Sequence, residues 1–338
     1  LFVVAMSVLG ALTLLPAVLA FVGPRIESMR LFGRDSGGEG TFWVRLSNLV
    51  MARPWAVFLP TVALLLALGV PFLDARLSSP DASILPSRTD SRRGADILER
   101  EFNEGEISPV IVAVEMPGPV NAPEQLAALW DFTRWLAADE RVMRIDSIVT
   151  IDPRLTLAQY ELLYRQPERL DDPLLGPAYQ RLASEDTPAV LVYTRDPSNS
   201  AASRDLVRDI RDYPRPAGMR LLVDGGAAEI EDVIGRMYST FPYVAALIVA
   251  VTYLVLLLML RSVLLPMKAI LMNALSIVAS FGAVVFIFQE GHFDWLLRFD
   301  RLGYVEASQP IILFCVLFGL SMDYEVFLLS RIREEYLR

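Results

Sequence analysis

The sequence predicts a polytopic α-helical membrane protein with an α+β, ferredoxin-like domain inserted between two of its spans. Of the 338 residues, 54% are hydrophobic and 21% are charged, and the mean hydropathy of +0.41 exceeds that of an ordinary soluble domain. Several stretches stay apolar over about twenty residues, the length that crosses about 30 Å of hydrocarbon. The long polar segment between the second and third stretches repeats a strand–helix–strand pattern.

The apolar stretches place the membrane spans. We expect transmembrane helices at residues 1–22, 55–73, 241–260, 269–288 and 310–329. The first stretch ends in "AVLA", as a cleaved signal peptide does, but it lacks the basic residues that begin such a peptide, and further spans follow it. The sequence begins inside an apolar run with Leu1 rather than Met, so we expect an internal piece of a longer protein.

Basic residues in the connections predict the orientation of the spans. They fall in the linker at residues 23–54, in the turn after the third span and in the tail, and comprise Arg25, Arg30, Arg34, Arg45, Arg53, Arg261, Lys268, Arg331, Arg333 and Arg338. These segments share one side if the spans alternate in direction, and that side is then the cytoplasm. Residues 74–240 and 289–309 are therefore expected outside, and residues 241–338 hold three spans and a cytoplasmic tail.

The external segment, residues 74–240, predicts a folded domain rather than a linker. Two strand–helix–strand units are expected, the first from "SPVIVAVEM", "APEQLAALWDFTRWLAAD" and "RIDSIVTI", the second from "PAVLVYTRD", "NSAASRDLVRDIRDY" and "MRLLVDGG". This order is typical of the split βαβ, ferredoxin-like fold. Residues 153–185 read as a helical insertion between the units. A helix is expected to run from Ala227 directly into the third span.

Composition and motifs exclude several classes of function. The formal net charge of −9 argues against nucleic acid as a partner, because phosphate binding needs a basic surface. The single cysteine, Cys315, excludes a thiolate metal cluster. The single histidine, His292, lies in a different loop from the external domain, which argues against a Ser–His–Asp hydrolase. The glycines at residues 33–40 lack the Lys-Ser/Thr ending of a phosphate-binding loop. We expect neither an enzyme nor a metal or cofactor site.

The last span, within "FCVLFGLSMDYEVFLLSRIREEYLR", contains two carboxylates and a phenol. An aspartate at the centre of a membrane helix costs about 2.5–3.5 kcal/mol, so these acids cancel most of the insertion energy of the apolar residues around them. Asp323 lies near the middle of the membrane, about 18 Å along the helix from Ile311. Intramembrane carboxylates mostly line ion or proton paths, which predicts a proton relay at Asp323 with the hydroxyl of Tyr324 beside it. Glu325 points to a different face and is expected to support the relay from nearer the cytoplasm.

The fourth span contains polar residues that are candidates for contact with these acids. Asn273, Ser276 and Ser280 recur at spacings of three and four and form one stripe on a helix. Two interpretations stay open for this stripe. It supports the relay, or it is the polar contact between helices that membrane proteins commonly use.

The sequence "FGLSMDYEVFLLSRIREE" closely resembles the signature of the MMPL family (mycobacterial membrane protein large), within the resistance–nodulation–division (RND) transporter superfamily. "ALTLLPAVLAFVGPRI" resembles the sixth span of that family. The resemblance implies a twelve-span exporter of two similar halves, each with a porter-type domain, and identifies this chain as a C-terminal-half fragment. Proton flow through Asp-Tyr pairs on the fourth and tenth spans drives such exporters, and Asp323 and Tyr324 match the tenth-span pair.

The resemblance therefore predicts a secondary active transporter in the cell (plasma or inner) membrane. We expect it to export lipids or other hydrophobic molecules by proton antiport, with protons as the coupling ion and no cofactor. Expected partners are membrane lipids, the hydrophobic substrate, the missing N-terminal half and, as a point left open, a second copy of the protein. Two alternatives remain: a drug- or hopanoid-type RND exporter, and a scaffold of envelope assembly that transports nothing, in which Asp323 is a buried hydrogen-bonding acid.

Overall fold

The computed structural model of the protein describes residues 2–26, 48–102, 104–167, 170, 172–184 and 186–336. The chain divides into two compact units, residues 1–61 and 62–338. Most of the predicted cytoplasmic linker at residues 23–54 lies outside the described residues, including the glycine-rich stretch at residues 33–40. The same holds for the side chains of six residues used to predict the orientation, namely Arg25, Arg30, Arg34, Arg45, Arg333 and Arg338.

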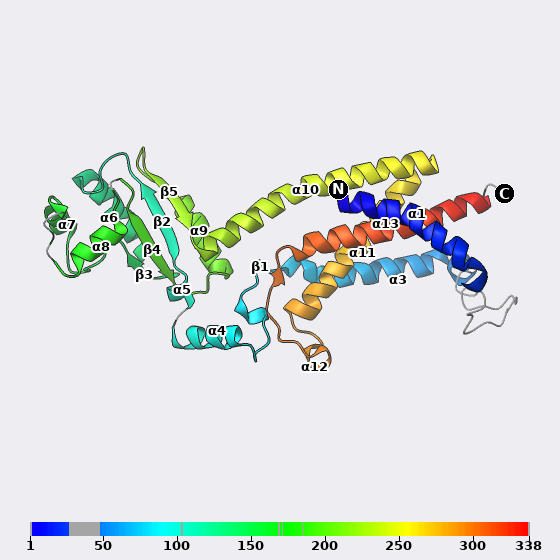
Figure 1. Ribbon diagram of the computed structural model, residues 1–338, viewed down its shortest axis with the longest axis horizontal. Coiled ribbons are helices and arrows are strands. Elements are labelled where there is room, and N and C mark those ends of the chain that lie inside the picture. The colour runs from blue at the N-terminus through cyan, green and yellow to red at the C-terminus, as the bar shows by residue number, and fades with distance from the viewer. Residues whose placement is uncertain are drawn as a thin grey trace. The chain divides into compact units, whose positions relative to one another are not determined.

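Helices predominate along the described chain, and six short strands interrupt them (Figure 1). The helices are α1 (Phe2–Ile26), α3 (Pro54–Gly69), α4 (Asp90–Glu101), α5 (Glu104–Ile107), α6 (Pro123–Ala137), α7 (Leu157–Leu163), α8 (Leu175–Leu182), α9 (Ala201–Arg211), α10 (Gly226–Leu260), α11 (Leu264–Val284), α12 (Asp294–Leu297) and α13 (Gln309–Tyr336). The strands are β1 (Leu77–Ser78), β2 (Val110–Glu115), β3 (Val142–Asp146), β4 (Ala189–Thr194), β5 (Arg220–Asp224) and β6 (Val305–Glu306). Short helical turns cover Val70–Asp74, Ala82–Ile84 and Val285–Gln289.

Four helical segments are long and apolar enough to cross a membrane, so the chain is a polytopic helical membrane protein. They are Pro54–Asp74, Gly226–Leu260, Leu264–Gln289 and Gln309–Ile332. Four of the five predicted spans fall within these helices. The first predicted span, residues 1–22, is also helical within α1, but its apolar stretch among the described residues, Ala5–Val18, is shorter than the other four.

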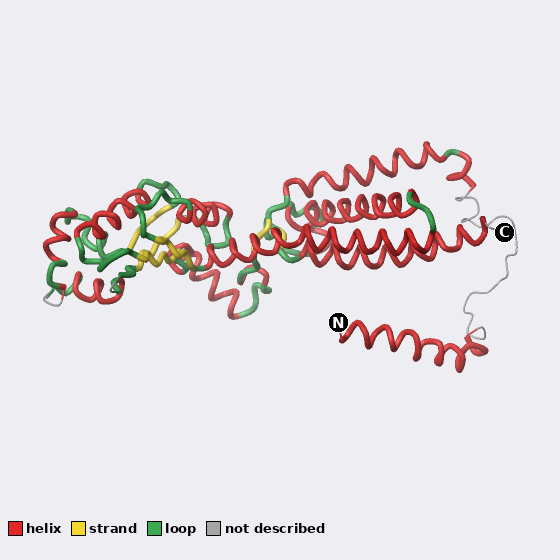
Figure 2. Tube along the Cα trace, turned by 90° about the horizontal axis from the view of Figure 1, so that it is seen from above, coloured by secondary structure: helices red, strands yellow, loops and turns green. Residues whose placement is uncertain are grey.

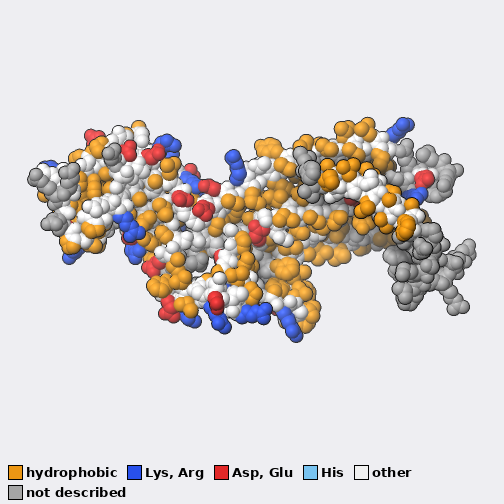
Figure 3. Space-filling view, viewed as in Figure 1, with side chains coloured by type: hydrophobic (Ala, Val, Ile, Leu, Met, Phe, Trp, Pro, Cys, Tyr) orange, Lys and Arg blue, Asp and Glu red, His pale blue; other side chains and the backbone are white. Residues whose placement is uncertain are grey.

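The membrane helices α10, α11 and α13 pack side by side (Figures 1 and 2). Their contact buries an apolar cluster formed by Leu256, Leu260, Ala269, Ile277, Phe318 and Met322. Many of the remaining side chains on these helices are apolar and exposed, and apolar side chains cover much of the surface seen in Figure 3. An outward-facing apolar surface of this kind suits contact with lipid tails, because lipid offers no polar partners.

The end of the Pro54–Asp74 span meets α11 where both helices carry glycine. A Cβ atom added at Gly282 would lie 1.9 Å from the carbonyl oxygen of Leu68, and one added at Gly69 would lie 2.8 Å from the Val278 side chain. Small residues allow such close approach of helix backbones, which drives association in lipid. These two glycines therefore set the distance between the two spans.

The polar segment forms a four-stranded antiparallel sheet in the order β3-β4-β2-β5. Numbered by sequence, these strands run second, third, first, fourth, which is the split βαβ order that the sequence predicted. The second strand begins at Val142 and ends at Asp146, so the prediction of a strand through residues 144–151 was too long at its C-terminal end. The predicted insertion at residues 153–185 contains α7 and α8.

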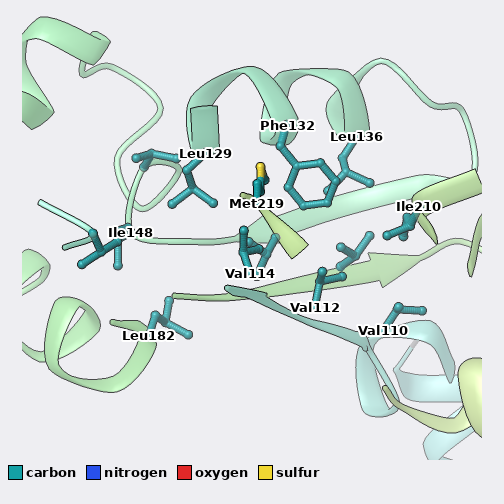
Figure 4. Packing of buried hydrophobic residues seen from close by; sticks show 14 of the residues in the cluster. Val110, Val112, Val114, Leu129, Phe132, Leu136, Ile148, Leu182, Ile210 and Met219 are labelled. Atoms are coloured by element: carbon teal, nitrogen blue, oxygen red, sulfur yellow. The ribbon is translucent and has the colours of Figure 1, made fainter. Parts of the chain in front are cut away.

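Helices α6 and α9 contribute seven buried residues to the apolar core that covers one face of the sheet (Figure 4), namely Leu126, Leu129, Phe132, Leu136, Leu206, Val207 and Ile210. Val110, Val112 and Val114 alternate along β2 and are buried, as strand periodicity requires. Phe132 and Leu136 of α6 are fully buried above them, as the helical spacing in the sequence indicated. This core is separate from the cluster of the membrane helices.

Helix α10 joins the sheet to the membrane without a break. It begins at Gly226, directly after β5, and ends at Leu260. The expected continuous helix is thus present, and the boundary placed between residues 240 and 241 falls inside it. Pro242 sits within this helix and does not end it.

The glycine contact predicts a stability difference between two matched substitutions. We expect Gly282→Ala to lower the midpoint of thermal unfolding in detergent, because the added methyl group meets the Leu68 carbonyl and forces the helices apart. Overpacking of this kind costs about 1–3 kcal/mol. Gly319→Ala in α13 is the control, since no atom lies within 4 Å of its added Cβ. Equal midpoints for the two variants would contradict this packing.

The sheet domain contains an ion-pair cluster that predicts sensitivity to acid. Arg141 contacts Asp139 at 2.6 Å and Asp209 of α9 at 2.6 Å, and its hydrogen bond lowers the pKa of Asp139 below the usual 3.8. A lowered pKa in the folded state adds stability above pH 3.8 that disappears as the pH falls through the lowered value. Asp139→Asn should therefore weaken the loss of stability at low pH. Acid unfolding followed by near-ultraviolet circular dichroism measures this loss. Asp205→Asn, at an exposed pair with Arg208, should leave that loss unchanged.

Candidate functional site

The predicted relay residues lie on α13, near the middle of the Gln309–Ile332 span. At 1.5 Å per residue, Asp323 is about 21 Å along the axis from Gln309 and about 14 Å from Ile332. No helix-breaking proline follows Pro310 at the start of the helix, so α13 continues through both carboxylates. The helix therefore places a carboxylate deep within the length that spans a bilayer.

The two faces of α13 have different surroundings. Phe318 and Met322 are buried in the cluster with α10 and α11. Asp323 is exposed on the other side, and Tyr324 and Phe327 are 76% and 73% exposed. Among the described residues, no hydrogen bond or ion pair reaches the side chains of Asp323 or Tyr324. The predicted relay residues thus share a face that the described residues of the unit 62–338 leave uncovered.

Glu325 occupies a different environment from Asp323. Its side chain is half-buried, and its Oε2 atom is enclosed without a hydrogen-bond partner. Residues two positions apart do not share a helix face, which explains why the two carboxylates diverge. An enclosed carboxylate oxygen without a donor is costly as an anion, so protonation of Glu325 or a donor from elsewhere would stabilise this position.

The polar stripe on α11 does not gather around Asp323. Asn273 is buried, and its amide nitrogen donates to the Phe318 carbonyl oxygen at 3.4 Å, while its Oδ1 atom has no partner. Ser276 donates to the Met272 carbonyl oxygen at 3.1 Å, and Ser280 donates to that of Ser276 at 2.9 Å. The structure thus uses Asn273 between helices and the serines within their own helix. A contribution of all three to a relay stays a prediction.

A second polar network, which the sequence analysis missed, links the membrane helices to the segment that follows the Pro54–Asp74 span. The buried side chain of Gln289 accepts from the Arg76 backbone at 2.7 Å and donates to the Asp74 carbonyl oxygen at 2.9 Å. Strand β1 then pairs in parallel with β6, Leu77 with Val305 and Ser78 with Glu306. The only sequence signal was a polar residue, Gln289, at the end of a long apolar run.

The same network reaches both α10 and the sheet domain. The Tyr238 hydroxyl on α10 donates to the Ala307 carbonyl oxygen at 3.0 Å. The hydroxyl of buried Ser78 donates to the Asn199 carbonyl oxygen at 2.9 Å, ahead of α9. Since β6 leads directly into α13, these bonds join the start of α13 to the sheet domain. Movement of either part would strain the other.

Relatives among known proteins match nearly the whole chain. The sequence profile of the MMPL family matches residues 83–338. Over 99% of its length, the chain is 30% identical to the mycolic acid-containing lipids exporter MmpL11 of Mycolicibacterium smegmatis and to the heme uptake protein MmpL11 of Mycobacterium tuberculosis. It is 28% identical, also over 99% of its length, to the membrane protein YdfJ of Bacillus subtilis. The chain covers 33%, 32% and 41% of these relatives, respectively.

The contact between Asn273 and Phe318 predicts a structural effect. We expect Asn273→Ala to destabilise the packing of α11 on α13 by about 1 kcal/mol, because a hydrogen bond between helices is lost. Thermal unfolding of the purified protein in detergent measures this effect. Ser276→Ala serves as the control and should change stability little, since its hydroxyl bonds only to its own helix. Unchanged stability of Asn273→Ala would show that Asn273 does not stabilise the contact between α11 and α13.

Proposed function

Because this chain belongs to the MMPL family of membrane proteins, we propose that the protein containing it is a proton-motive-force-driven exporter of lipids or other hydrophobic molecules across the cell membrane. The family match and the four long apolar helices make the chain a multi-pass protein of that membrane. A relative with 30% identity is named as an exporter of mycolic acid-containing lipids. Because the chain spans about a third of that relative, the export activity belongs to the whole protein.

The observation that carries the proposal is the exposed carboxylate of Asp323 in the middle of α13. Facing lipid, an ionised aspartate costs about 2.5–3.5 kcal/mol on insertion scales. Such a residue is retained where it faces other helices or a water-filled path. We infer that a further part of the protein covers this face and supplies groups that exchange protons with Asp323.

The proposed relay uses three side chains of α13. Asp323 accepts a proton from the outer side and, once neutral, no longer resists an apolar environment. The Tyr324 hydroxyl can donate and accept a hydrogen bond, so it can pass a proton to or from an acid on the part of the protein that covers this face. Glu325 lies nearer to Arg331 and the cytoplasmic end, where the proton would leave. Its enclosed Oε2 atom is compatible with passing through a neutral form.

The same proposal assigns the sheet domain to the outside of the cell as a porter-type domain. Helices α10 and α13 run in the same direction, because α11 returns between them. Arg261 after α10 and Arg331 near the end of α13 are therefore expected at the same, cytoplasmic side. The sheet domain precedes α10 and so lies at the opposite end. There, the Tyr238 and Ser78 hydrogen bonds would transmit movements of α13 to it.

A second candidate function follows from the name of another relative. The Mycobacterium tuberculosis MmpL11, also 30% identical, is named as a heme uptake protein. Heme is a hydrophobic molecule, so it would suit the same kind of transporter in the opposite direction. The direction of movement across proteoliposomes separates the two candidates. A scaffold would move neither substrate.

The relay is tested in the full-length protein reconstituted into proteoliposomes. We expect Asp323→Asn to reduce proton-coupled transfer of a fluorescent lipid to background, because the amide keeps the shape of the side chain but does not titrate. Tyr324→Phe should reduce the rate and leave residual transfer. A pH-sensitive dye inside the vesicles reports proton movement alongside lipid transfer.

Glu334→Gln on the same helix provides the matched control, since Glu334 lies beyond the Gln309–Ile332 span, is exposed and pairs with Arg331. This variant should transport at the native rate. Native transport by Asp323→Asn at normal expression would exclude the relay and favour the scaffold alternative. In that case, partner proteins recovered with the native protein should also be recovered with the variant.

A further inference from the structure

The sheet domain contains a cavity of about 730 Å³ on the face of β3 and β4 that α6 and α9 do not cover. Strand pairing explains its sheet wall. Val190, Val192 and Thr194 of β4 are buried in the core, so the alternate residues Leu191 and Tyr193 face the other side. Both line the cavity, and residues of α8 line it as well. The volume lies within the range of about 300–1,000 Å³ that is typical of small-molecule sites.

An irregularity in β3 places a cation in this cavity. Val142 pairs with Thr194, but Arg144 pairs with Tyr193, so β3 has one residue more than β4 at this point. Such a bulge reverses the side chains that follow it. The guanidinium group of Arg144 lies 4.0 Å from the centre of the Tyr193 ring and 3.2 Å from Asp146. Arg144 is thus held at the sheet wall, with its charge largely balanced by Asp146.

Arg181 adds a second cation from α8. It lines the cavity and is exposed, and within the described chain it forms no ion pair. The surplus positive charge of the cavity therefore belongs to Arg181. An exposed arginine beside a concave surface is free to form a charge-assisted hydrogen bond with a bound anion.

The rest of the lining is mainly apolar. Ile151, Pro173, Leu174, Pro177, Ala178 and Leu182 contribute most of it. Leu174 is 57% exposed, so an apolar ligand would remove it from water, which is favourable in proportion to the area covered. A purely ionic ligand would leave this apolar surface exposed to water. The lining matches a molecule with one charged end and one apolar end.

We propose that this cavity binds a single-chain amphiphile with an anionic head group, the head at Arg181 and Arg144 and the acyl chain between α8 and β4. The inference rests on the proposed function in one respect, since it names the substrate class that an external domain of a lipid exporter would hold. Binding itself needs no proton transfer. It is therefore measurable separately from transport.

The experiment uses the full-length protein in detergent with photoreactive palmitic acid, whose chain carries a diazirine, and locates the label by mass spectrometry. We expect label on residues of α8 and β4. Photoreactive lysophosphatidic acid, with a phosphate head, should label the same residues if negative charge alone is recognised. Label from only one of these two probes would identify the head group. Equal labelling by a neutral photoreactive monoacylglycerol would overturn the anionic class.

Two substitutions test the cavity from its two sides. Ala178→Trp fills it and should abolish the label. Arg181→Gln should lower the label about tenfold, as expected when a hydrogen bond to a charged group is lost, and Arg181→Lys should restore most of it. The controls are Ala158→Trp on α7 and Arg165→Gln, which are exposed and do not line the cavity. Arg181→Gln keeps the test decisive should Ala178→Trp fail to fold.

Three results would overturn the inference. The first is labelling of Ala178→Trp and Arg181→Gln at the native level. The second is a loss of label in the control variants equal to that in the cavity variants. The third is the absence of label on α8 and β4, as expected if another part of the protein fills the cavity. Repeating the labelling in Asp323→Asn separates this inference from the proposed function. If Asp323→Asn loses transport but its cavity is still labelled, both the relay and the binding site are supported. If Asp323→Asn still transports and is labelled normally, the relay is excluded and the binding site is still supported.

Discussion

The hydrocarbon interior of a bilayer offers no hydrogen-bond partner to the backbone, and this constraint organises most of the molecule. Each spanning segment satisfies its amide groups within a helix, and apolar side chains cover the outside. Contact between helices then depends on close packing rather than on exclusion of water. The approach of Gly282 to the Leu68 carbonyl shows how small residues make such packing close.

The same constraint makes the open face of α13 informative. Helix α13 buries Phe318 and Met322 against its neighbours and leaves Asp323 and Tyr324 on the exposed side. An apolar residue there would only indicate lipid contact. A carboxylate indicates a face that other protein or water must reach. The cover proposed above is compatible with relatives that are about three times as long as this chain.

The sheet domain and the membrane helices have separate cores, yet they are joined at several points. Helix α10 belongs to both, and the hydrogen bonds of Gln289, Ser78 and Tyr238 tie the remaining connections together. A bonded junction of this kind restrains relative movement more than a flexible linker would. In a transporter, it would allow a change at α13 to alter the shape of the sheet domain. Rigid support is the simpler role of the same contacts.

Local patterns in the sequence were sufficient for the four long spans, the order of strands and helices in the sheet domain and the continuity of α10. These features depend on periodicity and on the length of apolar runs, which are properties of neighbouring residues. The sequence also placed Asp323 and Tyr324 deep in a span. It could not show which face of α13 is buried, because both faces are largely apolar around the two carboxylates.

Features that join distant residues were decided only by the tertiary structure. The pairing of β1 with β6 and the bonds of Gln289 connect segments more than 200 residues apart, and no local pattern encodes them. The stripe of Asn273, Ser276 and Ser280 looked uniform in sequence, yet packing buried the first and left the hydroxyl groups to their own helix. The bulge that turns Arg144 toward the cavity likewise arises from register between strands, which depends on their partner rather than on their own sequence.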